Sequence, residues 1–198
     1  MRAYELEEAM IWSKPGMAAV IPVPEIDTIV LFNASDDMKM AIENHDYDMM
    51  EANIFGSIKL YPLKPGGKDY GVGEVGAEKG YGPLLYYLAM AKYGWLAPHY
   101  NGVSIHAKKV WKNFWDNKHI KRKGILNDHP EEYLSRAYAL DNTTQNKALQ
   151  TLRHLLEMGD VFINRFDGKL PRKQILGHID DAADDARRAK LGYSDADI

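Results

Sequence analysis

The feature of this sequence that most constrains its fold is a glycine-rich strand that leads directly into a helix. Residues 70–77 have the composition of a strand but carry Gly71, Gly73 and Gly76. Glycine inside a strand typically marks a β-bulge or a backbone that another group approaches closely. The spacing Gly-x-Gly-x-x-Gly also matches the dinucleotide-binding pattern. That pattern opens a helix, however, and this one lies within a strand, so we reject a Rossmann nucleotide site.

A second pair of glycines, Gly80 and Gly82, separates this strand from the next segment. Pro83 then begins a run in which Leu85 and Leu88 recur at helical spacing. Proline suits a first helical turn because its missing amide would have no intrahelical partner. A helix N-terminus presents unpaired amide donors, and glycines allow an anion to approach them. The order strand, Gly-x-Gly, helix therefore predicts either a phosphate-binding turn or an ordinary tight turn.

The remaining periodicity predicts an α/β (α+β) chain. Strand-like runs occupy 18–23, 28–32 and 53–61, and helical patterns occupy 3–14, 36–44 and 104–115. After residue 140 we expect two amphipathic helices, one ending at Gly159 and one running from Pro171 to Gly192. We divide the chain into a domain at 1–140 and a helical C-terminal extension at 141–198. The extension would pack on that domain or on a partner subunit.

Composition limits the chemistry that the chain can perform. It has 198 residues, enough for one domain with a small extension, and no cysteine, which excludes disulfides, thiolate nucleophiles and zinc–cysteine sites. Its histidines show no metal-ligand spacing, so we expect no metal. The apolar runs are shorter than the roughly 20 residues that span a bilayer, and the acidic N-terminus is unlike a signal peptide. We therefore expect an intracellular protein that does not enter a membrane.

Charge is unevenly distributed along the chain. Residues 108–123 hold seven Lys or Arg against one Asp, whereas 180–198 hold six Asp against three basic residues. The basic run either attracts phosphates, of nucleic acid or of a cofactor, or forms the solvated face of an amphipathic helix, and the second interpretation is the commoner one. The aromatic residues within it, Trp111, Phe114 and Trp115, are explained by packing of that helix, so they are not evidence for base stacking.

Two segments resemble a known family. Ala77-Glu78-Lys79-Gly80-Tyr81-Gly82 is similar to the Gln/Arg-x-x-Gly-x-Gly/Ala motif with which the GNAT superfamily of acyl-CoA-dependent N-acyltransferases binds the cofactor pyrophosphate. Ser104-x-x-Ala107-x-x-x-Trp111 is similar to the Asn-x-x-Ala-x-x-x-Tyr of the same family. The sequence from 72 to 117 most closely resembles small GNAT-like proteins encoded by tailed bacteriophages. Ala77 stands where the family has Gln or Arg, and Trp111 stands where it often has a tyrosine that acts as general acid.

The resemblance implies a GNAT-like mixed, mostly antiparallel sheet flanked by helices. It also implies acetyl-CoA or another acyl-CoA as cofactor and an unknown amine as acceptor. The cofactor-binding residues that it implies are Val75, Lys79, Gly80, Tyr81, Gly82, Leu84, Ser104 and Trp111.

Acyl transfer to an amine needs a base, a donor to the thioester carbonyl and an acid for the leaving thiolate. We expect Glu74 to be the base, because it lies in the strand beside the expected thioester; if it is buried, desolvation would raise its pKa toward neutrality. Tyr81 is the expected acid. The alternatives to these two residues are Glu78, His99 and His106 for the base, and Tyr86 and Tyr87 for the acid.

The resemblance leaves three functions open. The first is acyl transfer in the cytoplasm of an infected bacterial host. The second is a catalytically inactive scaffold that serves as a virion structural or assembly protein, either as a homo-oligomer or with other virion proteins. The third is a nucleic-acid-binding effector that acts through Lys108 to Lys123.

Overall fold

The computed structural model describes residues 15–22, 27–99, 102–125 and 129–191. The helix expected at 3–14 and the helix end expected at Gly192 lie outside these residues.

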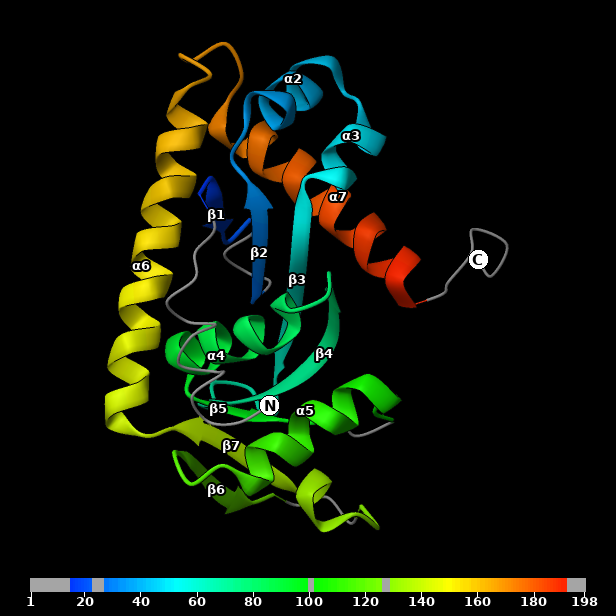
Figure 1. The fold of residues 1–198 in the computed structure, drawn as a ribbon, viewed down its shortest axis with the longest axis vertical. Helices are drawn as coiled ribbons and strands as arrows, with labels where there is room; N and C mark the ends of the chain where they lie inside the picture. Colours follow the sequence, from blue (N-terminus) through cyan, green and yellow to red (C-terminus); the bar gives the residue numbers. More distant parts are fainter. Residues whose placement is uncertain (1–14, 23–26, 100–101, 126–128, 192–198) are drawn as a thin grey trace.

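A seven-stranded open sheet forms the centre of the molecule (Figure 1). All neighbouring strands run antiparallel except β4 and β5, which are parallel. The expected mixed, mostly antiparallel sheet is therefore confirmed. In their order across the sheet, the strands are β1 (Met17–Val20), β2 (Thr28–Asn33), β3 (Ile54–Pro62), β4 (Asp69–Ala77), β5 (Trp95–Ala97), β7 (Arg136–Leu140) and β6 (Ile120–Gly124).

Helices cover both faces of the sheet. One face carries α4 (Tyr81–Tyr93), α5 (Ile105–Asp116) and most of α6 (Asn142–Asn164), and the other carries α2 (Asp36–Asn44), α3 (Tyr47–Ala52) and α7 (Arg172–Leu191). A short 3₁₀ helix, η1 (Glu132–Ser135), precedes β7. The long helix α6 runs beside β1 at the edge of the sheet and contributes its C-terminal end to the second face.

The strands β1 and β2 show why both faces need a cover. Along β2, Ile29 and Leu31 belong to the apolar core under α4, whereas Val30 and Phe32 belong to the core under α2 and α7. Successive side chains of a strand point to opposite faces, so a run that is apolar throughout buries both of them.

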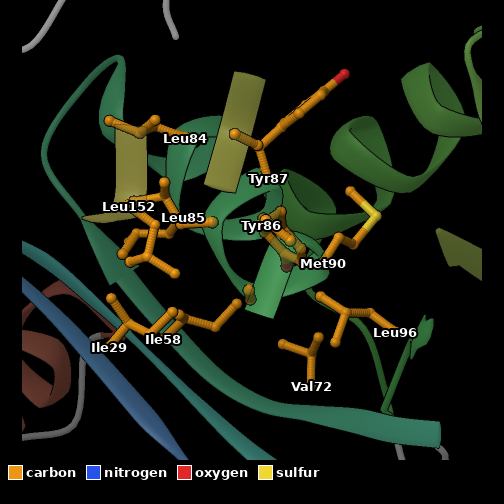
Figure 2. Close-up of a cluster of buried hydrophobic side chains, with 14 of the residues drawn as sticks. Ile29, Ile58, Val72, Leu84, Leu85, Tyr86, Tyr87, Met90, Leu96 and Leu152 are labelled. Carbon is orange, nitrogen blue, oxygen red and sulfur yellow. The ribbon is translucent and has the colours of Figure 1, made fainter. Parts of the chain in front are cut away.

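Helix α4 is the centre of the first core. Its buried residues lie on every side of the helix, which is the pattern of a helix enclosed by the protein. Figure 2 shows Leu85 facing Ile29 and Ile58 of the sheet, and Leu152 of α6 beside it. The helix begins at Tyr81 rather than at Pro83 as we predicted, because Gly80 supplies the non-helical cap.

Other elements also differ from the predictions. Helix α3 and strands β5, β6 and β7 were not predicted, and β6 means that the basic run 108–123 spans a helix and a strand instead of one helix. Helix α6 also continues past Gly159 to Asn164. Gly159 is not a helix end but a close contact, since a Cβ there would lie 2.2 Å from the Ala19 carbonyl oxygen.

The two helices that we assigned to a C-terminal extension pack directly on the sheet. Leu152 and Leu155 of α6 belong to the first core, and Phe162 of α6 and Ile179 of α7 belong to the second. Among the described helices, none is long and apolar enough to cross a bilayer.

Candidate functional site

Strands β4 and β5 pair for only a short distance and then diverge. Asp69 to Gly71 pair with Trp95 to Ala97, and no further pair joins the two strands in the part of the chain that the structure describes. A β-bulge lies at the point of divergence: Lys59 pairs with Glu74 and Leu60 with Val72, so that Gly73 is the extra residue. A bulge increases the local twist of a strand, which helps β4 to turn away from β5.

A cavity of about 410 Å³ lies in this gap. Its volume is in the range of small-ligand pockets, and an apolar wall with a few polar groups is typical of such pockets. The lining residues are Val72, Gly73, Glu74 and Val75 of β4, Tyr86 of α4, His99, Gly102 and Val103 after β5, and Ser104, Ala107 and Trp111 at α5.

The N-terminus of α4 is open to an incoming group. Gly80, the cap, has φ +100° and provides no side-chain cap, and a Cβ at Gly80 or Gly82 would meet nothing within 4 Å. The Tyr81 amide donates to the Glu78 carbonyl at 3.1 Å, and Pro83 has no amide. Of the unpaired amide donors that we expected at this helix start, the first turn therefore offers mainly the Gly82 amide.

The N-terminus of α5 forms another wall of the cavity. The Ser104 hydroxyl accepts a hydrogen bond from the Ala107 amide at 3.2 Å, which confirms Ser104 as the helix cap. Ser104, Ala107 and Trp111 then follow at a spacing that keeps them on one side of the helix, and all three line the cavity.

Glu74 lines the cavity but is not buried. Its side chain is 49% exposed, and its Oε2 accepts a hydrogen bond from Nε of Arg187 at 2.9 Å. The burial that we considered for this carboxylate is therefore not found. Val75, the next residue, faces the core under α4 and also lines the cavity.

Three tyrosines near the start of α4 have different surroundings. Tyr81 stacks on Phe55 with ring centroids 4.9 Å apart and is not among the cavity-lining residues. The Tyr87 hydroxyl accepts a hydrogen bond from the Asn117 side chain at 3.4 Å. Tyr86 lines the cavity, and its ring contacts that of Trp111 at 5.2 Å. Burial alone raises the pKa of the Tyr86 phenol, which therefore stays protonated at neutral pH.

The other predicted residues divide into two groups. His99 lines the cavity, whereas Glu78 and His106, the other alternative bases, are exposed and do not. Lys79 is exposed in the turn before α4, and the side chain of Leu84 is buried in the core (Figure 2).

Part of the cavity wall was not predicted from the sequence. It is formed by Val72, Gly102 and Val103. The only sequence signal for these residues was the glycines among and around them, and glycine spacing does not report which side chains face a cavity.

Much of the basic run is engaged within the molecule. Lys108 pairs with Glu131 at 2.7 Å and Lys123 with Asp69 at 2.6 Å. Arg122 donates to the Trp115 carbonyl at 2.9 Å and lies over the ring of the same residue. These contacts reduce the charge that is available to a nucleic-acid phosphate.

Among the described residues, no three histidine or acidic side chains lie close enough together to hold a metal ion. Comparisons of the chain with protein-family models, with curated proteins and with solved structures gave no match. The function must therefore be inferred from the geometry of the cavity itself.

Proposed function

We propose that the protein is an acyl-CoA-dependent N-acyltransferase of the GNAT type, which transfers an acyl group such as acetyl to an amine. The observation that carries the proposal is the cavity beside β4 where this strand diverges from β5. Tyr86, the α4 residue that lines it, lies one helical turn after Gly82 in the open first turn. The extended pantetheine arm of CoA would lie in the gap. Its diphosphate would lie near the Gly82 amide and the exposed Lys79, where the partial positive charge of the helix favours an anion.

The reacting groups would meet beside β4. Its edge after Gly71 has backbone donors that β5 does not occupy, and one of them would polarise the thioester carbonyl. The amine nitrogen attacks the carbonyl carbon, a base takes the amine proton, and the carbon–sulfur bond breaks to release the CoA thiolate. Glu74 and His99 are the cavity-lining candidates for the base. Tyr86, which lines the cavity where Tyr81 does not, would donate a proton to the sulfur.

Calorimetry with CoA and acetyl-CoA tests the binding step. Gly82→Asp is the informative variant, because a carboxylate in the first turn suits the helix dipole yet repels a diphosphate, and nothing lies within 4 Å of the new Cβ. The wild type and the uncharged control Gly82→Asn should bind, and Gly82→Asp should not. No binding by the wild type at millimolar cofactor would overturn the proposal.

Acyl transfer can be tested without knowing the acceptor, because the chain has no cysteine. In Glu74→Cys, the new thiolate should attack the bound thioester, release CoA and retain the acyl group, and the added acetyl mass should be located at residue 74. Glu78→Cys is the matched control, since Glu78 is exposed just after the same strand and does not line the cavity. Equal acetylation of both variants would contradict the proposed position of the thioester.

The alternative functions predict other outcomes. A non-catalytic virion scaffold with the same architecture would bind no CoA, and the protein would be present in purified particles. A nucleic-acid effector would show a salt-dependent affinity for nucleic acid that charge reversal within 108–123 abolishes. The ion pairs of Lys108 and Lys123 favour neither of these over acyl transfer. As an acyltransferase, the protein would act in the cytoplasm of the infected bacterial host.

A further inference from the structure

Arg187 is a buried charge beneath the strand that lines the cavity. It is 2% exposed and lies on α7, against the face of β4 opposite α4. The helix backbone is seated directly on the strand, because a Cβ at Gly76 would lie 2.7 Å from the Arg187 Cα. Glycine at position 76 is therefore what allows α7 to bring this arginine under β4.

The guanidinium contacts three side chains from three elements. Nε donates to Oε2 of Glu74 at 2.9 Å, Nη1 donates to the Ser57 hydroxyl of β3 at 2.8 Å, and Nη2 forms a close ion pair with Asp184, one turn earlier on α7. Burying a charged group lowers stability unless such partners form hydrogen bonds with it. Replacing a buried ion pair with apolar side chains of similar volume often costs no stability. Stability alone is therefore a weak reason for a buried arginine at this position.

The acidic partners of Arg187 have further charges nearby. Glu74 lies directly opposite Lys59 of β3 on the same face of the sheet, and Asp180, one turn before Asp184, has its pKa raised by burial and by Asp184. Arg187 bonds only Oε2 of Glu74, so Oε1 is the oxygen that would have to take a proton from a group in the cavity that residue 74 lines.

We infer that Arg187 is a positioning residue that fixes the Glu74 carboxylate at the cavity, while Asp184 supplies its counter-charge. The inference rests on the proposed function. In the reaction, the amine nitrogen bonds to the thioester carbon, its proton passes to Oε1 of Glu74, and CoA leaves as the thiolate. Displacing a catalytic base by about 1 Å can lower the reaction rate on the order of 100-fold. A buried guanidinium that holds the carboxylate in place would prevent such a displacement.

A double-mutant cycle with Glu74→Gln and Arg187→Met tests this inference, with acetyl-CoA as donor and ethylamine as acceptor. Methionine keeps much of the length of the arginine stem on Gly76. We expect Arg187→Met to lower kcat roughly tenfold or more in the wild-type background. In the Glu74→Gln background it should lower kcat less than about twofold, because residues that act through one another are not additive. Arg187→Lys should recover part of the rate, since lysine keeps the charge without the fork.

The unfolding free energy of the same four proteins separates a structural role from a positioning role. If Arg187→Met lowers kcat by the same factor in both backgrounds, the inference is wrong and the arginine is structural. Should Arg187→Met fail to fold, the cycle is run with Arg187→Lys, where the same non-additivity is expected. A wild type that binds acetyl-CoA but acetylates neither ethylamine nor hydroxylamine would overturn the base role of Glu74 and this inference together. A wild type that binds no acetyl-CoA would overturn the proposed function itself.

Discussion

Two neighbouring tyrosines of α4 show how the surroundings of a single residue decide its use. The Tyr87 hydroxyl has a hydrogen bond from Asn117, whereas burial is the sole cause that raises the pKa of the Tyr86 phenol, without a charge or hydrogen bond from the described residues. Tyr86 lines the cavity, and its hydroxyl is not among the fully buried polar atoms without a partner in the described residues. A hydroxyl on a cavity wall is available to a ligand.

Replacing Tyr86 with Phe tests this interpretation. We expect Tyr86→Phe to change the free energy of unfolding by less than about 0.5 kcal/mol, because its hydroxyl lies on the cavity wall. Tyr87→Phe should lower it by about 0.5 kcal/mol because it loses a hydrogen bond. Urea denaturation of the three proteins measures both changes. A loss of stability in Tyr86→Phe would show that its hydroxyl is a structural partner and not a free group of the cavity.

At the residue scale, the sequence was informative about the backbone and much less so about side-chain partners. The glycines of 71–76 predicted a bulge or a close backbone approach, and β4 has a bulge at Gly73 and a close contact between Gly76 and Arg187. The environment of Glu74 was not predictable, because its partner Arg187 is 113 residues away. No local pattern reports a contact at that separation.

At the scale of single elements, the same distinction applies. The helices expected at 36–44 and 104–115 begin where they were predicted. Ser35 and Ser104 each accept a hydrogen bond from the backbone amide three residues on, and such capping is a local interaction that the sequence reports. Strand β6 was missed because its residues Lys121 to Lys123 are polar, and only pairing with β7 makes them a strand. Whether a polar segment forms a strand depends more on the strand that it pairs with than on its own sequence.

The cap of α6 provides a pH-dependent prediction. The Asp141 carboxylate accepts a hydrogen bond from the Thr144 amide at 2.7 Å, and Asp141 also contacts His119. The Thr144 amide is the main cause that holds the pKa of Asp141 below its usual value. Because the pKa of Asp141 is lower in the folded state than in the unfolded state, its carboxylate stabilises the fold. The full stabilisation is present above the unfolded-state pKa of 3.8, and it is lost as the pH falls through the folded-state pKa.

We therefore expect Asp141→Ala to lower the free energy of unfolding by about 1 kcal/mol at pH 7. At pH values below the folded-state pKa, its difference from the wild type should shrink, because the wild-type carboxyl is then protonated. Urea denaturation across this pH range measures the difference. Asp141→Asn keeps the capping oxygen and is the control. A difference between Asp141→Ala and the wild type that did not change with pH would contradict the assigned charge effect.

Two helical glycines form a matched pair for the packing of α6 and α7. A Cβ at Gly159 would lie 2.2 Å from the Ala19 carbonyl oxygen, whereas one at Gly177 would meet nothing within 4 Å. Gly159→Ala should lower the free energy of unfolding by about 1–3 kcal/mol through overpacking. Gly177→Ala should raise it by about 0.5–1 kcal/mol through helix propensity. Thermal unfolding of both variants checks the contrast, and two changes of the same sign would mean that α6 does not touch β1 as described.

At the scale of the whole molecule, both faces of the sheet depend on the C-terminal helices. Leu152 and Leu155 complete the core under α4, and Phe162 packs edge-on against Phe32 of β2 at 5.2 Å. The amphipathic patterns of α6 and α7 were visible in the sequence, but the surface that they cover was not. A helical stripe shows that a partner exists without identifying it.

This arrangement gives a test of the division at residue 140. A chain that ends at Leu140 would expose the apolar face formed by Val20, Val30 and Phe32, because most of the helical surface that covers it belongs to α6 and α7. Each buried aliphatic or aromatic side chain contributes about 1.5–3 kcal/mol, and a whole domain has only about 5–15 kcal/mol of stability. We expect residues 1–140 alone not to unfold cooperatively in urea and to be degraded rapidly by chymotrypsin. Co-expression with residues 141–198 should restore a protease-resistant complex, since the same surfaces can pair between fragments. A 1–140 fragment that unfolds cooperatively by itself would instead establish an independent domain, with α6 and α7 as a true extension.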